Sequence, residues 1–385
     1  MFFFNNLPSE LKSLERQLDD ISIIIGENGS GKSTLLNDLS KHFLTEGQNV
    51  IALANSIHDK FDSVHRNFKT LRGRSGRRQT RNILKKAMET MAKGDITQNI
   101  KSASRVLRYV NFDPVIGFKV DKLNSSYRDK VQDADLTPNE KEQILYLLDR
   151  TLTENSNNEI IWLKMEDYNF SELQKSALIE LFVWESKLKG LKIIGRIEVY
   201  LKKSGKEISM LDASSGELAL ITSIVYLSTI IDERTVILID EPENSLHPKW
   251  QKEYAQTLFD IFSYYQPKII IATHSPLVVN GAELFTKDPK IYKSQNFILE
   301  LQQKEPLNLE ETYFRFFNIT TPENRFISEQ LIRLLNILSA KKISLDNFNN
   351  EIDRISSNSY DPKQKVALTS IKNIALQIAK NETLQ

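Results

Sequence analysis

The sequence predicts an α/β protein built around a parallel sheet. Three short apolar runs rich in β-branched residues, 21–25, 235–240 and 268–273, have the composition of strands that are buried on both faces. The first run is followed by a glycine-rich turn and an amphipathic helix, and a helical region near 249–263 lies between the other two. Such alternation of strands and helices is typical of an open α/β sheet.

Composition narrows the class of protein. The 385 residues suffice for one large domain or two ordinary ones. A net charge of +1 provides no overall field toward nucleic acid or membrane, so any such preference must be local. The lack of cysteine excludes disulfides and thiolate metal sites. The sequence shows neither a signal-peptide pattern nor an apolar run of roughly 18–20 residues, so we expect a cytoplasmic protein without a membrane partner.

The α/β pattern is interrupted once. We expect a core formed by 1–59 and 191–300, in which 49–55 is a further strand. The segment 191–203 alternates as antiparallel strands and leads into a hairpin-type turn at 204–206.

The other two regions are predicted to be helical. Between 60 and 190 glycine becomes scarce and charge is high, which indicates a mostly helical insertion, and 301–385 is expected to be a helical C-terminal region. Helical periodicity is clearest in four segments: 141–152, 176–188, 326–341 and 366–379.

The first candidate site is the turn GENGSGKS at 26–33, which fits the pattern G-x-x-x-x-G-K-[ST] between a strand and a helix. Glycines let backbone N–H groups wrap phosphates, and the helix N-terminus favours anions. We expect Lys32 to neutralise the β- and γ-phosphates, the Ser33 hydroxyl to bind Mg²⁺ and Thr34 to reach the α-phosphate. The predicted nucleotide contacts are Gly26, Glu27, Asn28, Gly29, Ser30, Gly31, Lys32, Ser33 and Thr34. A chance glycine loop is the alternative.

Two carboxylates form the second candidate. Asp240 and Glu241 end the run 235–240, at the edge where ligands bind in open α/β sheets. Asp240 suits Mg²⁺, and Glu241 is placed to polarise an attacking water. Alone, the pattern also fits a strand that ends in a solvated acidic turn.

Two weaker signals complete the set. The segment LDASSGE at 211–217 precedes an apolar helical run, and its plainer interpretation is a serine N-cap with a nearby acid. His274 directly follows the run 268–273, where a lone histidine is more often a satisfied structural residue.

In this order, the four features resemble the ABC-type ATPases. The turn 26–33 resembles the Walker A motif, Asp240 and Glu241 resemble Walker B, and His274 resembles the switch histidine that contacts the γ-phosphate. The residues that resemble the signature loop are Ser214, Ser215, Gly216 and Glu217. They depart from the usual L-S-G-G-Q, because Ala213 stands for Leu, Ser215 for the first Gly and Glu217 for Gln.

The string DEPENSLHP (240–248), which includes the D-loop position, narrows the resemblance. It is similar to the soluble RecF-like and OLD-like ATPases of the AAA-15/AAA-21 type, relatives of the structural-maintenance-of-chromosomes proteins, rather than to transporters. No TOPRIM-like cluster follows residue 280, so a nuclease domain is not expected. Gln79 is a candidate for the Q-loop in an atypical setting. The resemblance covers about 1–55 and 191–280.

The resemblance implies a mechanism and a self-partner. In this family ATP and Mg²⁺ lie between the Walker motifs of one protomer and the signature loop of another, which implies a head-to-tail dimer or a higher oligomer. The implied catalytic residues are Glu241, which activates water, and His274 and Lys32, which hold the γ-phosphate.

A basic segment at 66–86 suggests a further partner. It contains nine basic residues and no acidic one: Arg66, Lys69, Arg72, Arg74, Arg77, Arg78, Arg81, Lys85 and Lys86. Such a density can contact DNA or RNA phosphates. The alternatives are a solvated basic face or one that docks on an acidic partner.

Two functions remain open. The first is an ATPase that couples hydrolysis to a nucleic-acid-related or anti-phage defence process with a separate effector protein, where the defence role rests on family analogy. The second is an ATP-gated scaffold or sensor that sequesters and releases a toxin or nuclease without binding nucleic acid. The string DEPENSLHP disfavours a transporter subunit, and the missing metal-ligand cluster disfavours a nuclease.

Overall fold

The fold is an α/β arrangement around a parallel sheet. The computed structural model describes residues 7–15, 20–55, 59–73, 81–83, 85, 97–154, 160–165, 177–244, 246–295, 297–302, 309–317, 325–357 and 362–381. The main sheet has seven strands in the order β11-β10-β1-β9-β8-β2-β3. Neighbouring strands are parallel except for β10 and β11, which are antiparallel. The strands are β1 (Ile21–Ile25), β2 (Asn49–Ala54), β3 (Phe68–Arg72), β8 (Thr235–Asp240), β9 (Lys268–Thr273), β10 (Lys290–Gln295) and β11 (Ile298–Leu301).

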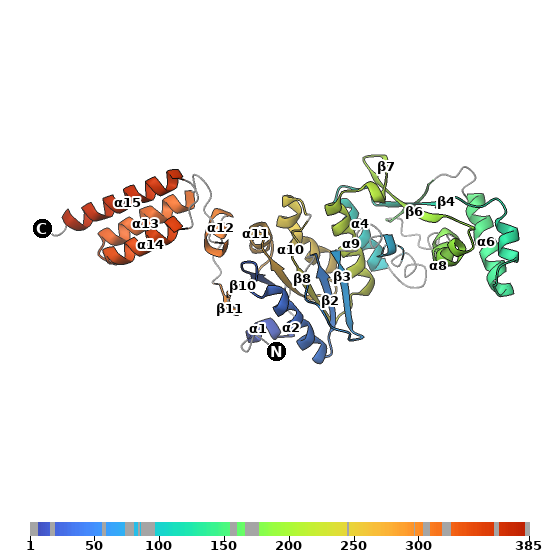
Figure 1. Ribbon diagram of the computed structural model, residues 1–385, viewed down its shortest axis with the longest axis horizontal. Coiled ribbons are helices and arrows are strands. Elements are labelled where there is room, and N and C mark those ends of the chain that lie inside the picture. The colour runs from blue at the N-terminus through green and yellow to red at the C-terminus, as the bar shows by residue number, and fades with distance from the viewer. Residues whose placement is uncertain are drawn as a thin grey trace.

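Helices cover both faces of this sheet (Figure 1). Because side chains alternate along a strand, each apolar run serves two cores. Ile24, Leu238 and Ile270 pack with helix α2 (Lys32–Thr45) on one face. Ile23 and Ile271 point to the other face, where the cluster includes the remaining core helices. These are α4 (Thr97–Tyr109), α9 (Ser215–Ile230), α10 (Pro248–Phe262) and α11 (Pro276–Phe285).

Strand β3 corrects the expected boundary of the insertion. Residues 68–72 were assigned to the region outside the core, but they pair in parallel with β2 and form the edge of the main sheet. An edge strand is half-buried, and only Phe68 and Leu71 of FKTLR are buried, so the strand presents no continuous apolar run. Lys69 and Arg72 of the basic segment therefore belong to a strand.

The insertion also contains strands, so its description as mostly helical was incomplete. A second sheet has the order β5-β4-β6-β7 and is antiparallel. Its strands are β4 (Val115–Asp121), β5 (Ile161–Lys164), β6 (Arg196–Lys203) and β7 (Lys206–Ser209). Ser204 and Gly205, with φ of +50° and +77°, form the predicted turn between β6 and β7, as a two-residue hairpin requires. The first strand of this hairpin begins at Arg196 rather than at the predicted 191.

The remaining helices flank these sheets. In the insertion they are α5 (Tyr127–Gln132), α6 (Pro138–Glu154) and α8 (Ala177–Gly190). The C-terminal region contains α12 (Leu309–Phe317), α13 (Arg325–Ser339), α14 (Leu345–Ser357) and α15 (Pro362–Asn381). Helices α12 to α15 share a separate apolar cluster, and Figure 1 shows α13 to α15 and the antiparallel sheet at opposite ends of the molecule. Two short helices are α1 (Ser9–Lys12) and η2 (Met210–Asp212). Among the described residues, no helix combines the length and the apolarity that crossing a membrane requires.

Helices α10 and α11 approach closely at a glycine. A Cβ atom placed on Gly281 would lie 1.7 Å from the backbone oxygen of Lys252. Backbone cannot yield as a flexible side chain does, so any side chain at this position must push the two helices apart.

We predict that Gly281→Ala lowers the free energy of unfolding by about 1–3 kcal/mol, because the added methyl group has no space between α10 and α11. Urea unfolding followed by circular dichroism measures the change. Gly190→Ala is the matched control, since a Cβ there meets nothing within 4 Å. Equal unfolding midpoints for the two variants would contradict the close packing.

Candidate functional site

The turn after β1 is a glycine-rich loop that leads into α2. Gly29 and Gly31 have φ of +82° and +96°, values that L side chains rarely adopt. Gly31 is the N-cap of α2, and no side chain caps the first turn of that helix. The loop is tied to β10, because the Ser294 hydroxyl donates to the Ser30 carbonyl at 2.9 Å. The loop thus presents the N-terminus of α2, which suits an anion.

Lys32 lies across this loop. Its Nζ donates to the carbonyl oxygens of Gly26 and Glu27 at 2.9 and 3.1 Å, and it lies 2.8 Å from Nε2 of His274. Burial lowers the pKa of the Lys32 ammonium to about 8, although Glu241 and Asp240 oppose the change. Burial and Lys32 likewise lower the pKa of His274, which indicates a neutral ring. An ammonium can only donate, so Nε2 of this neutral ring is the acceptor and Nδ1 carries the proton.

Asp240 is the most constrained group of the site. It is 0% exposed, and no described residue donates a hydrogen bond to either of its carboxylate oxygens. Burial raises its pKa to about 6. The nearby Ser33 hydroxyl opposes this rise, but the two groups lack ordinary hydrogen-bond geometry. A buried, unpaired carboxylate beside a hydroxyl supplies the hard oxygen ligands that Mg²⁺ prefers, so the residues present fit that ion.

Glu241 adopts a strained backbone. Its φ is +53°, and its N–H donates to Ala272 at 2.9 Å, which holds the turn against β9. Its carboxylate accepts from Asn244 Nδ2 at 3.0 Å and lies 3.6 Å from His274 Nε2. A left-handed backbone at a non-glycine residue is often found at functional sites, where the surrounding structure enforces it. Lys32, Asp240, Glu241 and His274 therefore converge at the carboxyl edge of β1, β8 and β9.

Two residues of this site were missed by sequence reasoning. Glu243 accepts from the His274 backbone N–H at 2.5 Å and from the Thr273 hydroxyl at 2.8 Å. Gln251 accepts from the Ser275 hydroxyl at 2.6 Å. The string 240–248 drew attention to Glu243 only as part of a family pattern, since nothing in its spacing indicates which backbone it would meet.

Residues 214–217 form a capping box at the start of α9. Ser214 Oγ accepts from the Glu217 N–H at 3.3 Å, and Glu217 accepts from the Ser214 N–H at 2.9 Å and from Lys203 Nζ at 2.7 Å. The motif therefore forms the serine N-cap with a nearby acid that its plainer interpretation predicts. Ser214 and Ser215 are exposed. Within the described part of the chain, no hydrogen bond or ion pair joins 214–217 to Lys32, Asp240, Glu241 or His274.

Three of the nine basic residues of 66–86 are used inside the protein. Arg72 pairs with Asp59 and donates to the Phe61 carbonyl. Arg81 and Lys85 both pair with the buried Glu185. Arg66 and Lys69 are exposed. The predicted contacts Arg74, Arg77, Arg78 and Lys86, the Q-loop candidate Gln79 and Ser245 of the D-loop lie outside the described residues.

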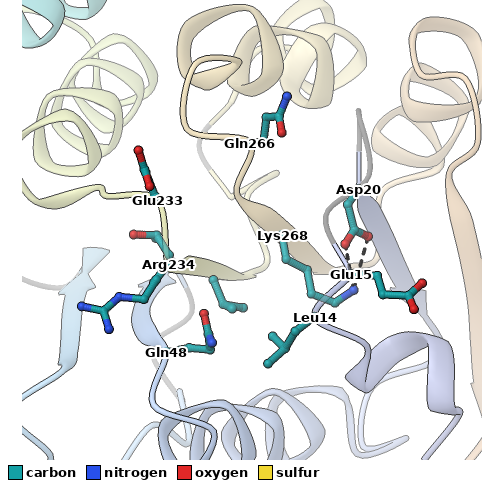
Figure 2. A pocket seen from close by; sticks show the side chains of 10 residues that line it. Leu14, Glu15, Asp20, Gln48, Glu233, Arg234, Gln266 and Lys268 are labelled. Carbon is teal, nitrogen blue, oxygen red and sulfur yellow. Dashed lines mark hydrogen bonds and ion pairs between the residues drawn. The ribbon is translucent and has the colours of Figure 1, made fainter.

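A separate polar hollow lies at the opposite edge of the sheet (Figure 2). It is lined by residues at the amino ends of β1, β8 and β9, among them Arg234 and Gln266. Lys268 pairs there with Asp20 at 3.0 Å and lies 3.4 Å from the Glu10 carbonyl. Because Lys268 and Asp20 neutralise each other, this buried pair offers no free charge to a ligand.

We predict that Asp240→Asn stabilises the protein at pH 7.5 in the absence of Mg²⁺ and nucleotide. The folded-state pKa of about 6 exceeds the ordinary aspartate pKa of 3.8, so the folded state holds this proton more tightly and loses stability as pH rises from 3.8 to about 6. Removing the charge should therefore raise the free energy of unfolding by about 1–2 kcal/mol at pH 7.5, with the gain fading toward pH 4. Thermal unfolding across this range measures it.

The exposed Asp129 offers a control, since Asp129→Asn should leave stability nearly unchanged at every pH. A gain for Asp240→Asn that does not depend on pH would show that ionisation of Asp240 is not its source.

Known families match two parts of the chain. Residues 175–280 match the family AAA_21, described as "AAA domain, putative AbiEii toxin, Type IV TA system". This segment contains the signature-like residues, Asp240, Glu241 and His274. Residues 103–156 match the "Arginine decarboxylase C-terminal helical extension", a segment that here contains α5 and α6.

Two curated proteins are similar to the chain in sequence. The chain is 26% identical over 351 residues to the "Retron Vc95 probable ATPase" of Vibrio cholerae, covering 67% of this chain and 66% of that protein. It is 37% identical over 70 residues to "Protein ea59" of Escherichia phage lambda, covering 18% of this chain and 13% of that protein.

Solved structures resemble the chain only remotely. CbiO1 from Clostridium perfringens, part of the ABC transporter complex cbiONQ, covers 85% of this chain and 89% of its own at 15% identity, with a TM-score of 0.27. The Smc head domain from Pyrococcus furiosus covers 70% and 65% at 12% identity, with a TM-score of 0.24. Neither score is high enough to support an inference. Residues 175–280 therefore match the AAA_21 family, and the motifs at 26–33, 240–241 and 274 resemble those of ABC-type ATPases.

Proposed function

We propose that the protein binds Mg²⁺-ATP at the 26–34 loop and hydrolyses it. The observation that supports this most strongly is the buried carboxylate of Asp240, which has no hydrogen-bond partner among the described residues and lies beside Ser33 and Lys32. An isolated buried carboxylate is costly, and a cation at this position would remove the cost. A bound Mg²⁺ would neutralise phosphate charge, with Ser33 and Asp240 holding the ion directly or through water.

Lys32 and His274 would change partners when ATP binds. Lys32 now donates to two carbonyl oxygens and to His274. Phosphate oxygens are stronger acceptors, so the ammonium would turn to them and release Nε2 of His274. The phosphate charge would also raise the pKa of His274 and allow Nε2 to be protonated and donate to the γ-phosphate. Glu241 would then accept a proton from the attacking water.

The other half of the site would come from a second copy. The start of α9, with Ser214, Ser215 and Gly216, has an anion-binding helix N-terminus, and Ser214 and Ser215 are exposed. Among the described residues of one chain, no hydrogen bond or ion pair joins them to the cluster around Lys32. A head-to-tail dimer would bring them onto the γ-phosphate of the partner's ATP. Glu217 would act from within its own chain, since its carboxylate is held by Ser214 and Lys203.

The biological role is proposed from the relatives. The name of the Vibrio cholerae relative connects that protein with a retron, and the AAA_21 description refers to a type IV toxin–antitoxin system. We therefore propose that this chain is an ATPase that regulates a separate effector protein in a defence-type system. The match covers 66% of the retron relative, so this role extends beyond the shared segment.

The internal ion pairs of the basic segment favour the second candidate, a scaffold or sensor that does not bind nucleic acid itself. Arg72, Arg81 and Lys85 have partners within the protein, which reduces the charge available to a phosphate backbone. Direct contact with DNA or RNA would then depend on Arg66, Lys69, Arg74, Arg77, Arg78 and Lys86.

We predict that Glu241→Gln lowers kcat for ATP hydrolysis at least about 100-fold while ATP binding is retained, because the variant keeps the shape of the side chain but loses the base. Lys32→Ala should weaken ATP binding instead. Phosphate release and equilibrium binding of a fluorescent ATP analogue separate the two effects. Glu142→Gln, at an exposed position on α6, should match the wild type. Wild-type hydrolysis by Glu241→Gln would remove Glu241 as the base.

We further predict that two inactive variants restore each other. In a head-to-tail dimer of Lys32→Ala with Gly216→Asp, one of the two sites combines an intact 26–34 loop with an intact signature segment. Mixing should therefore recover up to about one quarter of wild-type activity, given half of the dimers as heterodimers with one working site each. Each variant alone serves as the control. No recovery despite heterodimer formation, seen with two affinity tags, would contradict a site shared between protomers.

A further inference from the structure

We propose that Glu243 and Gln251 are positioning residues that fix His274 for the reaction. This inference rests on the proposed hydrolysis of ATP. Among the described residues, neither side chain forms a hydrogen bond with the side chains of Lys32, Glu241 or His274, which would face ATP. Both instead hold the backbone segment 273–275 that carries the imidazole of His274.

Glu243 holds this segment at two points. One carboxylate oxygen accepts from the His274 N–H at 2.5 Å, and the other accepts from the Thr273 hydroxyl at 2.8 Å. The Thr273 hydroxyl in turn accepts from the Ser275 N–H at 2.9 Å. Burial raises the pKa of Glu243, while the hydrogen bonds from His274 and Thr273 oppose the rise. The hydrogen bonds from His274 and Thr273 therefore offset part of the cost of burying the Glu243 carboxylate, and the same bonds fix the backbone at 273–274.

Gln251 holds the same segment from the next helix. Its amide oxygen accepts from the Ser275 hydroxyl at 2.6 Å, and its Nε2 donates to the Leu246 carbonyl at 2.9 Å. Ser275 is also the N-cap of α11, where its Oγ accepts from Leu277 and Val278. Gln251 thus joins the start of α11 to the loop that precedes α10.

The two anchors set the distance between His274 and Glu241. Glu241 and Glu243 belong to one turn, which is closed by hydrogen bonds from Asn244 N to Glu241 O and from Leu246 N to Glu243 O. One side of this turn therefore carries the Glu241 carboxylate, which would accept the proton of the attacking water, and the other side holds the backbone of His274. His274 Nε2 lies 3.6 Å from Glu241 and 2.8 Å from Lys32. Displacement of such a group by about 1 Å can cost about 100-fold in rate.

Charge is the competing explanation for Glu243. Its negative charge raises the pKa of Lys32, although less than Glu241 and Asp240 do. Glu243→Gln separates the two roles. The glutamine oxygen can still accept from His274 N–H, and its amide can donate to Thr273 Oγ1, so the geometry is kept and the charge is lost.

The test compares Glu243→Ala, Glu243→Gln and Gln251→Ala, each alone and combined with His274→Ala. We expect Glu243→Ala to lower kcat about 10- to 100-fold with the Kd for ATP changed less than about 3-fold. Glu243→Gln should remain within a few fold of the wild type. Neither Glu243→Ala nor Gln251→Ala should lower kcat further once His274 is alanine, because each acts through that residue.

Additive losses in the double variants would overturn the proposal, as would a Glu243→Gln variant as slow as Glu243→Ala. Gln251→Ala keeps the test available if Glu243→Ala does not fold.

An NMR titration of His274 in nucleotide-free protein provides a readout independent of hydrolysis. In the wild type, burial and Lys32 hold the pKa of His274 below its ordinary value. Glu243→Ala should raise that pKa because the ring leaves Lys32, and Glu243→Gln should not. Equal His274 pKa values in these two variants would overturn the anchoring role. Failure of the wild type to hydrolyse ATP would instead reject the proposed function and leave this comparison intact.

Discussion

The burial of Asp240, whose carboxylate accepts no hydrogen bond from the described residues, is the constraint on which the rest of the site depends. It places a carboxylate of raised pKa at the carboxyl edge of a parallel sheet, next to a glycine-rich loop of the kind that can direct several N–H groups to one centre. Lys32 lies over the same centre with a lowered pKa. Both groups are held in their less favourable environment by the sheet around them, and both would be relieved by a ligand that carries a cation and an anion together.

Hydrogen bonds between neighbouring strands and loops fix the positions of the residues around Asp240 and Lys32. Ser294 of β10 holds the glycine loop, the Glu241 N–H is bound to β9, and Glu243 holds the residues after β9. The groups around the centre thus come from segments far apart in the sequence but adjacent in the sheet. Each of these bonds has a backbone group on at least one side, so the spacing of the site depends on the register of the strands as well as on the side chains of Ser294 and Glu243.

The carboxyl edge of the main sheet has a physical connection to the C-terminal helices through α12. Lys293 of β10 donates to the Arg315 carbonyl of α12 at 3.1 Å. Glu283 of α11 lies near Glu311 of α12. Burial, and next to it the negative charge of Glu311, raise the pKa of Glu283 to about 7. Phe314 of α12 belongs to the apolar cluster of the C-terminal helices, and Arg354 of α14 lies over its ring. Helix α12 therefore contacts β10, which holds the 26–33 loop through Ser294, and lies near α11, which begins two residues after His274.

Much of this protein was determined by sequence alone. The apolar runs of β1, β8 and β9 specify a parallel sheet, and the glycine loop is likewise readable from the sequence, because strand burial and glycine conformation are local properties. The order of Lys32, Asp240, Glu241 and His274 after these strands predicts that they share one edge of the sheet. Tertiary structure alone decided the rest. Strand β3 lacks an apolar run since an edge strand is only half-buried, and the internal use of Arg72, Arg81 and Lys85 depends on partners such as Glu185, 100 residues away along the chain from Lys85. The roles of Glu243 and Gln251 likewise depend on which backbone groups lie opposite them, and no local pattern encodes a contact between segments that meet only when the sheet forms.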